Sequence, residues 1–324
     1  MTKILSLIFI IPLMFIGSFS YVFSQQVSAK IELSPESPEP KSLVTLTFSS
    51  YSFDTNSAFI TWKVDGVTKL SGVGENKLIL NTGNVGQSQT VTLTAENQVG
   101  YFVEQRIVVT PASVILMYEA PKSHVPLFYE GKSFAATAGL IRVTALPSVG
   151  DERGVFDPSS LSYTWYVNDE PMKNASGRGK QSIETKLDFL RTKNDIKVVV
   201  RTPSGESVSK TISVSPRNID PKLYEYDELF GTKLTSPINK RLETSKTVSL
   251  KLEPYFLSYQ DDKPSSYRWL LDGFNITPQD GQVVALVPKE NSYGVKQLTV
   301  SVFGPDKRLQ SAETSLEIIF DSRE

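Results

Sequence analysis

The chain contains no cysteine and a single histidine, His124, among its 324 residues. Without cysteine it can form no disulfide, no thiolate nucleophile and no cysteine-built zinc site. One histidine leaves little material for the acid–base chemistry in which this residue is most often used. We therefore expect a protein that is not an enzyme, has no catalytic residues and takes no cofactor.

The chain also lacks an excess of charge of either sign. Its 34 Lys and Arg residues against 35 Asp and Glu residues give a formal net charge of −1, so no strong field attracts nucleic acid. Hydrophobic residues make up 40% of the chain and charged residues 21%, which is typical of a folded protein with buried cores. We expect a globular protein with no nucleic-acid partner.

The longest uncharged hydrophobic run lies at the N-terminus. Residues 4–17 carry no charge and follow Lys3, which is the pattern of a secretory signal. Small or β-branched residues before position 25 suit cleavage there, so residues 1–24 are predicted to be a signal peptide. The alternative is an uncleaved membrane anchor at residues 4–23, which would be the sole membrane contact. Either way, we expect an extracytoplasmic protein, secreted or at the cell surface. Export without cysteine favours a bacterial source.

The three tryptophans mark an internal repeat. Trp62, Trp165 and Trp269 lie 103 and 104 residues apart, and each sits in a stretch where large and polar residues alternate. A turn dipeptide follows each stretch: Asp-Gly after Trp62 and Trp269, and Asn-Asp after Trp165. These dipeptides tolerate the backbone angles of a tight hairpin. Each tryptophan is therefore predicted to lie on a strand that enters a hairpin.

Alternating apolar positions before and after each tryptophan predict further strands, and no segment beyond the N-terminal run has a convincing helical period. The fold class is predicted to be all-β, with about seven short strands in each repeat. Two facing antiparallel sheets around a buried tryptophan form an immunoglobulin-like sandwich. We therefore assign Trp62, Trp165 and Trp269 to the structural core.

The repeat predicts three tandem domains after the signal segment. They are expected at residues 25–112, 113–216 and 217–324, with boundaries near Pro111 and Pro216. A proline at the end of a last strand stops the hydrogen-bonded ladder and stiffens the connection.

At the tryptophan hairpins the chain resembles bacterial extracellular Ig-like domains, particularly those of the polycystic-kidney-disease (PKD) type. The resemblance is carried by the Trp-x-Val-Asp-Gly pattern at Trp62 to Gly66, by its variant at Trp269 to Gly273, and by a late Val-x-Val strand. It covers about residues 31–320. It implies PKD-like tandem β-sandwiches that act as non-catalytic spacer, adhesion or recognition modules at the cell surface.

Aromatic residues near the start of the second and third repeats are candidate recognition residues. Tyr118, Tyr224 and Tyr226, together with Phe128 and Phe230, would form an exposed strip along the chain. The alternative is that these residues belong to first strands that contact a neighbouring domain.

Metal binding has one candidate location. Asp220, Asp227 and Glu228 lie near the second predicted boundary and offer the oxygen ligands that calcium prefers. The alternative is that these acidic groups are simply solvated. His124 has no second histidine to share a metal and is expected to lie at the surface.

The leading functional hypothesis is an exported, non-enzymatic cell-surface protein that acts as a spacer, an adhesin or an assembly subunit, with a protein or a glycan as partner. A second hypothesis is carbohydrate binding by exposed aromatic residues that stack on sugar rings, for which the candidates are Tyr51, Phe53, Phe256 and Tyr259. A third is the addition of a partner's strand to an exposed sheet edge.

Overall fold

The computed structural model describes residues 29–233, 236–260, 265–278, 281–291 and 293–322. The predicted signal peptide and the alternative anchor at residues 4–23 lie outside the described residues. Within these ranges, no helix is long and apolar enough to cross a membrane.

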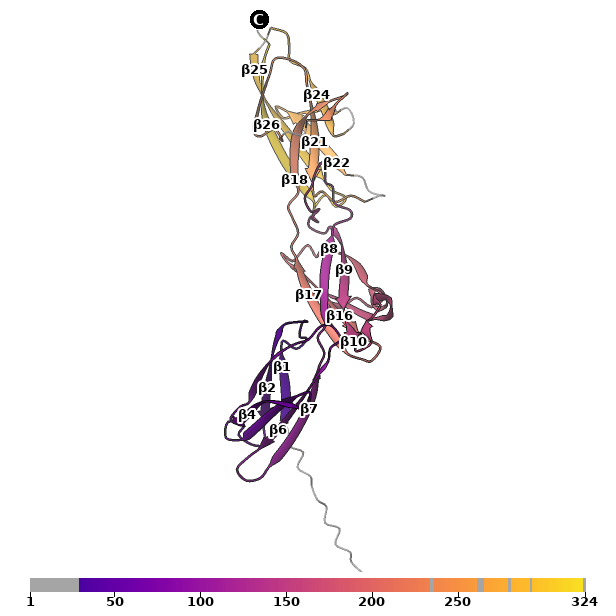
Figure 1. Cartoon of the computed structure of the whole chain (residues 1–324). Coiled ribbons are helices and arrows are strands. Elements are labelled where there is room, and N and C mark those ends of the chain that lie inside the picture. The colour runs from indigo at the N-terminus through magenta and orange to yellow at the C-terminus, as the bar shows by residue number, and fades with distance from the viewer. Residues whose placement is uncertain (1–28, 234–235, 261–264, 279–280, 292, 323–324) are drawn as a thin grey trace, which may run out of the picture. The chain divides into compact units, whose positions relative to one another are not determined.

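The fold class is all-β, as the sequence predicts (Figure 1). In the described part of the chain, the helical elements are the short 3-10 turns η1 (Pro158–Ser160) and η2 (Lys173–Ala175). The Cα positions group into two compact units. Among the described residues, one comprises residues 29–32, 46–78 and 91–107, and the other comprises residues 33–45, 79–90 and those from 108 onward.

The N-terminal strands form two sheets. The sheet in the order β1-β2-β5 comprises β1 (Ala29–Ser34), β2 (Leu43–Ser50) and β5 (Lys77–Asn81). The sheet in the order β4-β3-β6-β7 comprises β3 (Phe59–Val64), β4 (Val67–Val73), β6 (Gln89–Glu96) and β7 (Phe102–Val109). Asp65 and Gly66 connect β3 to β4 with positive φ angles of 51° and 81°, as a tight hairpin requires.

The next strands form what we call the middle sandwich, made of two facing sheets and a short ribbon. One sheet has the order β15-β9-β8, with β8 (Ser113–Glu119), β9 (Leu140–Ser148) and β15 (Ser182–Lys186). The other has the order β13-β12-β16-β17, with β12 (Ser162–Val167), β13 (Glu170–Pro171), β16 (Asn194–Arg201) and β17 (Ser207–Val214), and with β14 (Gly177–Arg178) also paired to β12. The ribbon comprises β10 (Gly150–Asp151) and β11 (Gly154–Val155).

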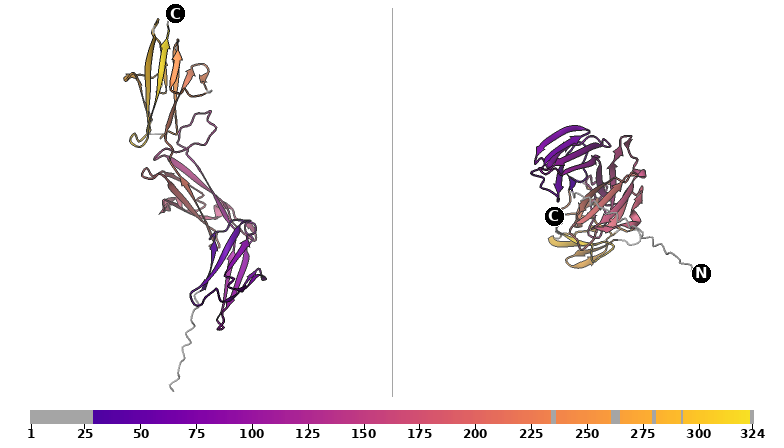
Figure 2. Two further views of the ribbon diagram at one scale, coloured as in Figure 1. Left: turned by 90° about the vertical axis from the view of Figure 1, so that its left-hand side faces the viewer. Right: turned by 90° about the horizontal axis from the view of Figure 1, so that it is seen from below.

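The last strands form the C-terminal sandwich. One sheet has the order β19-β18-β21-β24, with β18 (Asp220–Asp227), β19 (Gly231–Thr232), β21 (Val248–Tyr255) and β24 (Val283–Leu286). The other has the order β20-β26-β25-β22-β23, with β20 (Arg241–Thr244), β22 (Ser266–Leu271), β23 (Phe274–Ile276), β25 (Tyr293–Phe303) and β26 (Ser311–Asp321). Strand β20 runs parallel to β26. Figure 2 shows these strands from two further directions.

Apolar side chains from facing sheets form the cores of the middle and C-terminal sandwiches. In the middle sandwich, Ile141 and Val143 of β9 pack in one cluster with Trp165 of β12 and Val198 of β16. In the C-terminal sandwich, the corresponding cluster joins residues of β18 and β21 to residues of β22, β25 and β26. These alternating inward positions give the Ig-like sandwich architecture its two-layer core.

Each tryptophan is fully buried and makes the same kind of hydrogen bond. The indole N–H groups donate to backbone carbonyl oxygens 12 to 15 residues further along the chain. The bonds are Trp62 to Glu75 at 2.7 Å, Trp165 to Lys180 at 2.8 Å and Trp269 to Gly281 at 3.0 Å. A buried indole needs such a partner, and the repeat preserves it at all three positions.

Candidate functional site: the joint between the middle and C-terminal sandwiches

The most elaborate arrangement of polar and aromatic side chains lies where the middle sandwich meets the C-terminal sandwich. We call this region the joint and define it as residues 120–139, 253–260 and 304–310. Residues 120–139 connect β8 to β9, and the other two segments follow from the ends of β21 and β25. All three belong to the same compact unit.

Backbone pairing fastens the β8–β9 connection to the chain beyond β21. Ser123 and Ser258 form an isolated antiparallel bridge. Backbone hydrogen bonds on either side of the bridge are His124 N to Leu257 O at 2.8 Å, Phe256 N to His124 O at 2.7 Å and Tyr259 N to Lys122 O at 2.9 Å. The two segments therefore form a short antiparallel pairing, although they are far apart in sequence.

Two local features, the close contacts at Gly139 and the backbone conformation of Phe256, show that the joint is tightly packed. A Cβ atom on Gly139 would lie 2.9 Å from Ser258 Oγ and 2.7 Å from the carbonyl oxygen of Ala136, so no larger residue fits without displacement. Phe256 adopts a positive φ of 65°, which is rare for a bulky residue. Such a conformation costs roughly 1–3 kcal/mol and persists only where surrounding contacts hold it.

A buried carboxylate lies at the centre of the joint. The Glu253 side chain is 4% exposed and accepts a hydrogen bond from His124 Nε2 and another from Lys251 Nζ, each at 2.9 Å. Burial by itself raises the pKa of the Glu253 carboxyl, but the bonds from His124 and Lys251 outweigh burial and hold the pKa below its ordinary value. The carboxylate therefore stays ionised and links the two sandwiches through His124.

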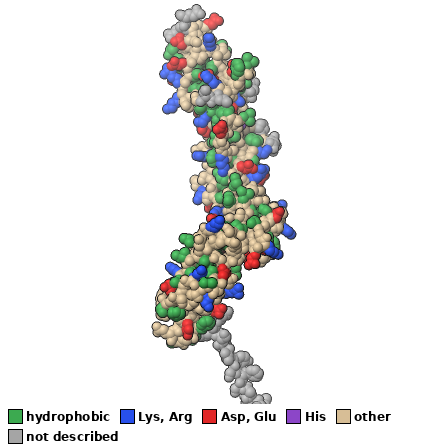
Figure 3. All heavy atoms as spheres, viewed as in Figure 1, with side chains coloured by type: hydrophobic (Ala, Val, Ile, Leu, Met, Phe, Trp, Pro, Cys, Tyr) green, Lys and Arg blue, Asp and Glu red, His purple; other side chains and the backbone are tan. Residues whose placement is uncertain are grey.

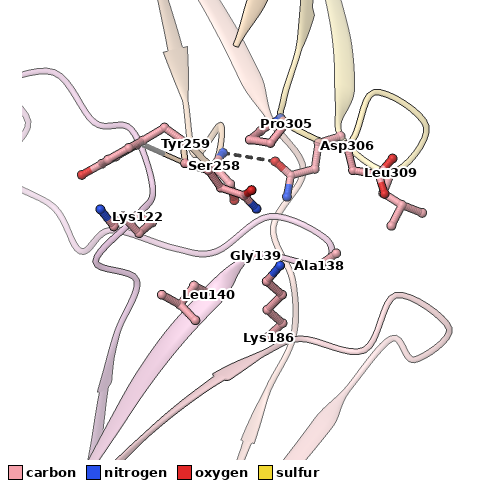
Figure 4. Close-up of a pocket in the computed structure, with 12 residues that line it drawn as sticks. Lys122, Ala138, Gly139, Leu140, Lys186, Ser258, Tyr259, Pro305, Asp306 and Leu309 are labelled. Carbon is pink, nitrogen blue, oxygen red and sulfur yellow. Dashed lines mark hydrogen bonds between the residues drawn. The ribbon is translucent and has the colours of Figure 1, made fainter. Parts of the chain in front are cut away.

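Gln310 forms a second polar link. Its amide Nε2 donates to the Thr137 carbonyl oxygen at 2.7 Å, and its Oε1 accepts from the Ser258 N–H at 3.2 Å, the bond drawn in Figure 4. Gln310 is buried, so its polar atoms are satisfied by these partners instead of by bulk water. One side chain thus ties three segments of the joint together.

Aromatic rings fill the rest of the joint through edge-to-face contacts. The pairs are Phe128 with Tyr224 at 5.6 Å, Tyr129 with Tyr255 at 5.5 Å and Phe134 with Phe256 at 5.6 Å between ring centroids. The hydroxyl groups of Tyr224 and Tyr255 lie 2.9 Å apart in a hydrogen bond. Burial and this bond both raise the pKa of Tyr255, so the phenol stays protonated well into alkaline solution.

A cleft of about 640 Å³ opens in the joint, whose residues make up most of its lining (Figure 4). Lys122, Leu140 and Lys186 line it from the middle sandwich, and Tyr259, Asp306 and Leu309 line it from the C-terminal sandwich. Clefts of this size at a domain interface are common locations for bound small molecules.

The candidate recognition residues do not share one exposed strip. Tyr224 is 3% exposed and packs inside the joint, so its predicted exposure is wrong. Tyr118 is half-buried with the Lys132 ammonium 3.2 Å from its ring centroid, and Tyr226 is half-buried at the far end of β18. Recognition by Tyr118 or Tyr226 stays a prediction.

The structure adds a partner to His124, which the sequence places at the surface. The side chain is 31% exposed, so it lies partly at the surface, and it is bonded to Glu253 within the joint. Its partner lies 129 residues away in sequence, on a strand that carries no signal for histidine binding. This distance explains why sequence inspection missed the pair.

The candidate calcium ligands are not brought together. Asp220 and Asp227 occupy opposite ends of the eight-residue strand β18, about 23 Å apart at the usual rise per residue. Asp220 pairs with Lys222 at 3.0 Å, and Asp227 accepts from the N–H groups of Leu229 and Phe230 in its own turn. Across the described residues, no group of at least three His, Cys, Asp or Glu side chains is placed to hold a metal ion.

Among the candidate sugar-stacking residues, two lie at the surface and two do not. Tyr51 is 83% exposed and Tyr259 is 42% exposed. Phe53 is half-buried against Phe48, and Phe256 is half-buried within the joint. Of the four, only Tyr259 lines the cleft.

The sequence matches no protein-family model and no curated protein. It is similar to several solved structures. Fibronectin(III)-like modules of Clostridium thermocellum CbhA match with 16% identity and a TM-score of 0.28, over 58% of this chain and 94% of theirs. The central fibronectin-III array of RIM-binding protein matches with 12% identity and a TM-score of 0.27, over 90% and 96%. A structure described for host cell surface retention of a 1.5-MDa bacterial ice-binding adhesin matches with 10% identity and a TM-score of 0.25, over 91% and 99%. These likenesses concern the β-sandwich fold and carry no information on function.

Proposed function

We propose that this chain is an exported, non-enzymatic cell-surface protein that holds a partner-binding region at a fixed position as a spacer or assembly subunit. It is built from three Ig-like domains at residues 25–112, 113–216 and 217–324. A protein or glycan at the cell surface is its partner. The chain is either secreted after cleavage of residues 1–24 or anchored through residues 4–23.

The observation that carries this proposal is the construction of the joint. Two sandwiches connected only by a flexible linker would reorient freely, because such a linker behaves as a random coil. Here the connection is fastened by backbone pairing at Ser123 and Ser258, by the His124–Glu253 pair and by Gln310. A protein that must keep a fixed spacing gains from this construction, whereas free tethering does not require it.

Surface charge is compatible with a protein that works outside the cell without a polyanionic partner. On the face shown in Figure 3, basic and acidic side chains are interspersed. Exposed ion pairs include Arg142 with Glu119 at 2.8 Å and with Glu184 at 2.6 Å. Exposed pairs of this kind contribute little to stability and serve mainly to keep the surface soluble.

The experiment that tests the proposal combines surface proteolysis with mass analysis in the cells that make the protein. Intact cells are treated with a protease that cannot enter them, and a cytoplasmic protein serves as the control. We expect degradation of this chain while the control survives. The intact mass then shows whether residues 1–24 have been removed. Full protection in intact cells, with degradation only after lysis, would contradict export.

A further inference from the structure

We propose that one end of the sheet β4-β3-β6-β7 docks on the surface of a zwitterionic lipid bilayer. The proposal rests on the anchored form of the proposed function, in which residues 4–23 stay attached and cross the membrane. It is carried by the apolar side chains at this end, by a carboxylate among them and by the place where the described chain begins. We call this end the aromatic end and define it by five exposed residues: Phe59, Val73, Val99, Tyr101 and Phe102.

A row of side chains crosses the outer face of the sheet at the aromatic end. Phe59 of β3 lies opposite Val73 of β4 on one side and opposite Glu96 of β6 on the other. The backbone hydrogen bond that closes the β6–β7 turn, at 3.1 Å, places Glu96 opposite Phe102. Opposite residues of antiparallel strands have Cβ atoms about 4.5–5.5 Å apart, so these side chains form one continuous surface. Phe59 and Phe102 are 53% and 59% exposed, whereas the neighbouring Ile60 is buried in the core.

The turn between β6 and β7 extends this surface beyond the sheet. Asn97 Oδ1 accepts from Val99 N at 3.1 Å and from Tyr101 N at 2.9 Å, so the turn is fixed by its own first residue. Val99 and Tyr101 are nevertheless exposed. Large apolar residues gathered on a surface mark an interaction site, and a turn that is already fixed loses little conformational entropy on docking.

The described chain begins next to the aromatic end. Residues 29–32 belong to the same compact unit as every residue of the aromatic end. The pKa of Lys30 is raised chiefly by its hydrogen bond and charge pairing with Glu32, and also by Tyr51, which lies in the loop that leads to β3. The first residues of β1 therefore lie beside a loop at this end of the sheet.

The length of the preceding segment sets how far the aromatic end can lie from a membrane. Residues 24–28 separate the proposed anchor from β1. Even a fully extended chain covers at most about 22 Å between residues 23 and 29. A chain anchored through residues 4–23 therefore keeps this end of the sheet close to the bilayer. Aromatic rings are enriched at the membrane–water interface, and interfacial binding strengthens with the apolar area that is buried.

Glu96 indicates which lipid headgroup fits. Its carboxylate is exposed between Phe59 and Phe102 and has no side-chain partner among the described residues. Anionic headgroups would be repelled by this carboxylate. The ammonium group of a zwitterionic headgroup is instead attracted to the carboxylate and to the faces of the two phenyl rings. The surface of phosphatidylcholine is therefore a matching one.

The test is synthesis of the full chain, by a purified translation system without signal peptidase, into vesicles of phosphatidylcholine. The chain has no cysteine, so Val99→Cys provides one site for a fluorophore. Val67→Cys is the matched control, because Val67 is an exposed valine at the opposite end of β4, about 20 Å from Val73. A spin label on some lipid headgroups quenches fluorophores at the bilayer surface. We expect strong quenching at position 99, little at position 67, and weaker quenching at position 99 in vesicles of phosphatidylglycerol.

Further variants separate docking by the aromatic end from the effect of the tether alone. In the chain labelled at position 99, Phe59→Ser with Phe102→Ser removes two exposed rings and should shift the equilibrium about tenfold toward the undocked state. Glu96→Lys keeps both rings and should also weaken docking, because it repels the ammonium groups. Phe189→Ser with Leu190→Ser is the matched control, since it removes two exposed apolar side chains from the other compact unit. It should leave the quenching unchanged.

Washing the vesicles with alkaline carbonate distinguishes failure of the anchor from failure of docking. Release of the chain would overturn the proposal together with the anchored form, as would an intact mass from cells that begins at residue 25. A chain that stays in the vesicles keeps its anchor. For that chain, equal quenching at positions 99 and 67, or wild-type quenching in the phenylalanine variant, would overturn docking by the aromatic end. Stronger quenching in phosphatidylglycerol would overturn the choice of headgroup.

Discussion

Replacing Glu253 with glutamine should loosen the joint. The carboxylate accepts hydrogen bonds from His124 and Lys251, each at 2.9 Å. Bonds to charged groups contribute about 1.5–3 kcal/mol each. However, the His124 and Lys251 side chains are roughly a third exposed, so water can replace part of the hydrogen bonding that they lose when the carboxylate is removed. Glutamine can still accept one bond through its amide oxygen. We therefore expect Glu253→Gln to cost about 1–3 kcal/mol in total.

The destabilisation caused by Glu253→Gln should be larger at pH values above the unfolded pKa of the carboxyl than below it. The pKa of Glu253 is lower in the folded protein than in the unfolded chain. A carboxyl with a depressed pKa stabilises the folded state above its unfolded pKa, about 4.3, and this stabilisation is lost as the pH falls through the folded value. Wild type and Glu253→Gln should therefore differ clearly at about pH 5.5 and progressively less below about pH 4.3.

Hydrogen exchange followed by mass spectrometry measures how readily the joint opens, peptide by peptide. Peptides that cover residues 120–139 and 250–260 report opening of the joint, and peptides from β12 and β16 report the middle core. Glu243→Gln is the control, because Glu243 forms an exposed pair with Arg241 at 3.0 Å. This replacement should change the free energy of unfolding by less than about 0.5 kcal/mol. Unchanged protection of the joint peptides in Glu253→Gln at pH 5.5 would show that the Glu253 carboxylate does not hold the joint, as would an equally large effect in Glu243→Gln.

Three further predictions concern the cores, the alkaline limit and metal dependence. Trp165→Ala should destabilise the middle sandwich by about 3–5 kcal/mol in urea unfolding followed by circular dichroism, and a loss below about 1 kcal/mol would contradict its place in the core. The pKa of Tyr255 is higher in the folded protein than in the unfolded chain. The protonated Tyr255 hydroxyl therefore contributes fully to folded-state stability below the unfolded pKa of about 10, and this contribution is lost as the pH rises above it. Absorbance at 295 nm should show tyrosines that ionise only when the chain unfolds. Tyr255→Phe should make this delayed step smaller without removing it, because burial also raises the pKa of Tyr163 and of Tyr267. Treatment with EDTA should leave the melting temperature unchanged, since Asp220 and Asp227 lie at opposite ends of β18, and a drop would reveal a calcium site.

The strands and hairpins were predictable because their signals are local. Period-two alternation assigns strands, and the dipeptides after the tryptophans adopt the positive φ angles that their residue types favour. Asn168 and Asp169 have φ angles of 50° and 68°, and Asp272 and Gly273 have 49° and 82°. Nothing in these signals depends on distant parts of the chain, which is why the sequence reveals them.

The joint was not predictable for the opposite reason. Residues 120–139 show no regular strand pattern, and their partners lie more than a hundred residues away, as in the Gln310–Thr137 bond across 173 positions. Tyr224 illustrates the consequence. Alternation along β18 would place Leu223 and Tyr224 on opposite faces, one buried and one exposed. Both are buried, because Phe128 from the β8–β9 connection covers the second face.

If the joint fixes the middle sandwich to the C-terminal sandwich, spin labels on the two sandwiches must keep one distance from each other. The chain has no cysteine, so two cysteines can be introduced into the same chain, one at exposed position 197 on β16 and one at exposed position 268 on β22. Both can then be labelled without background. Electron paramagnetic resonance on the frozen protein should give one narrow distance distribution at pH 5.5 and a broader one in Glu253→Gln. A broad distribution in the wild-type chain would contradict a fixed joint.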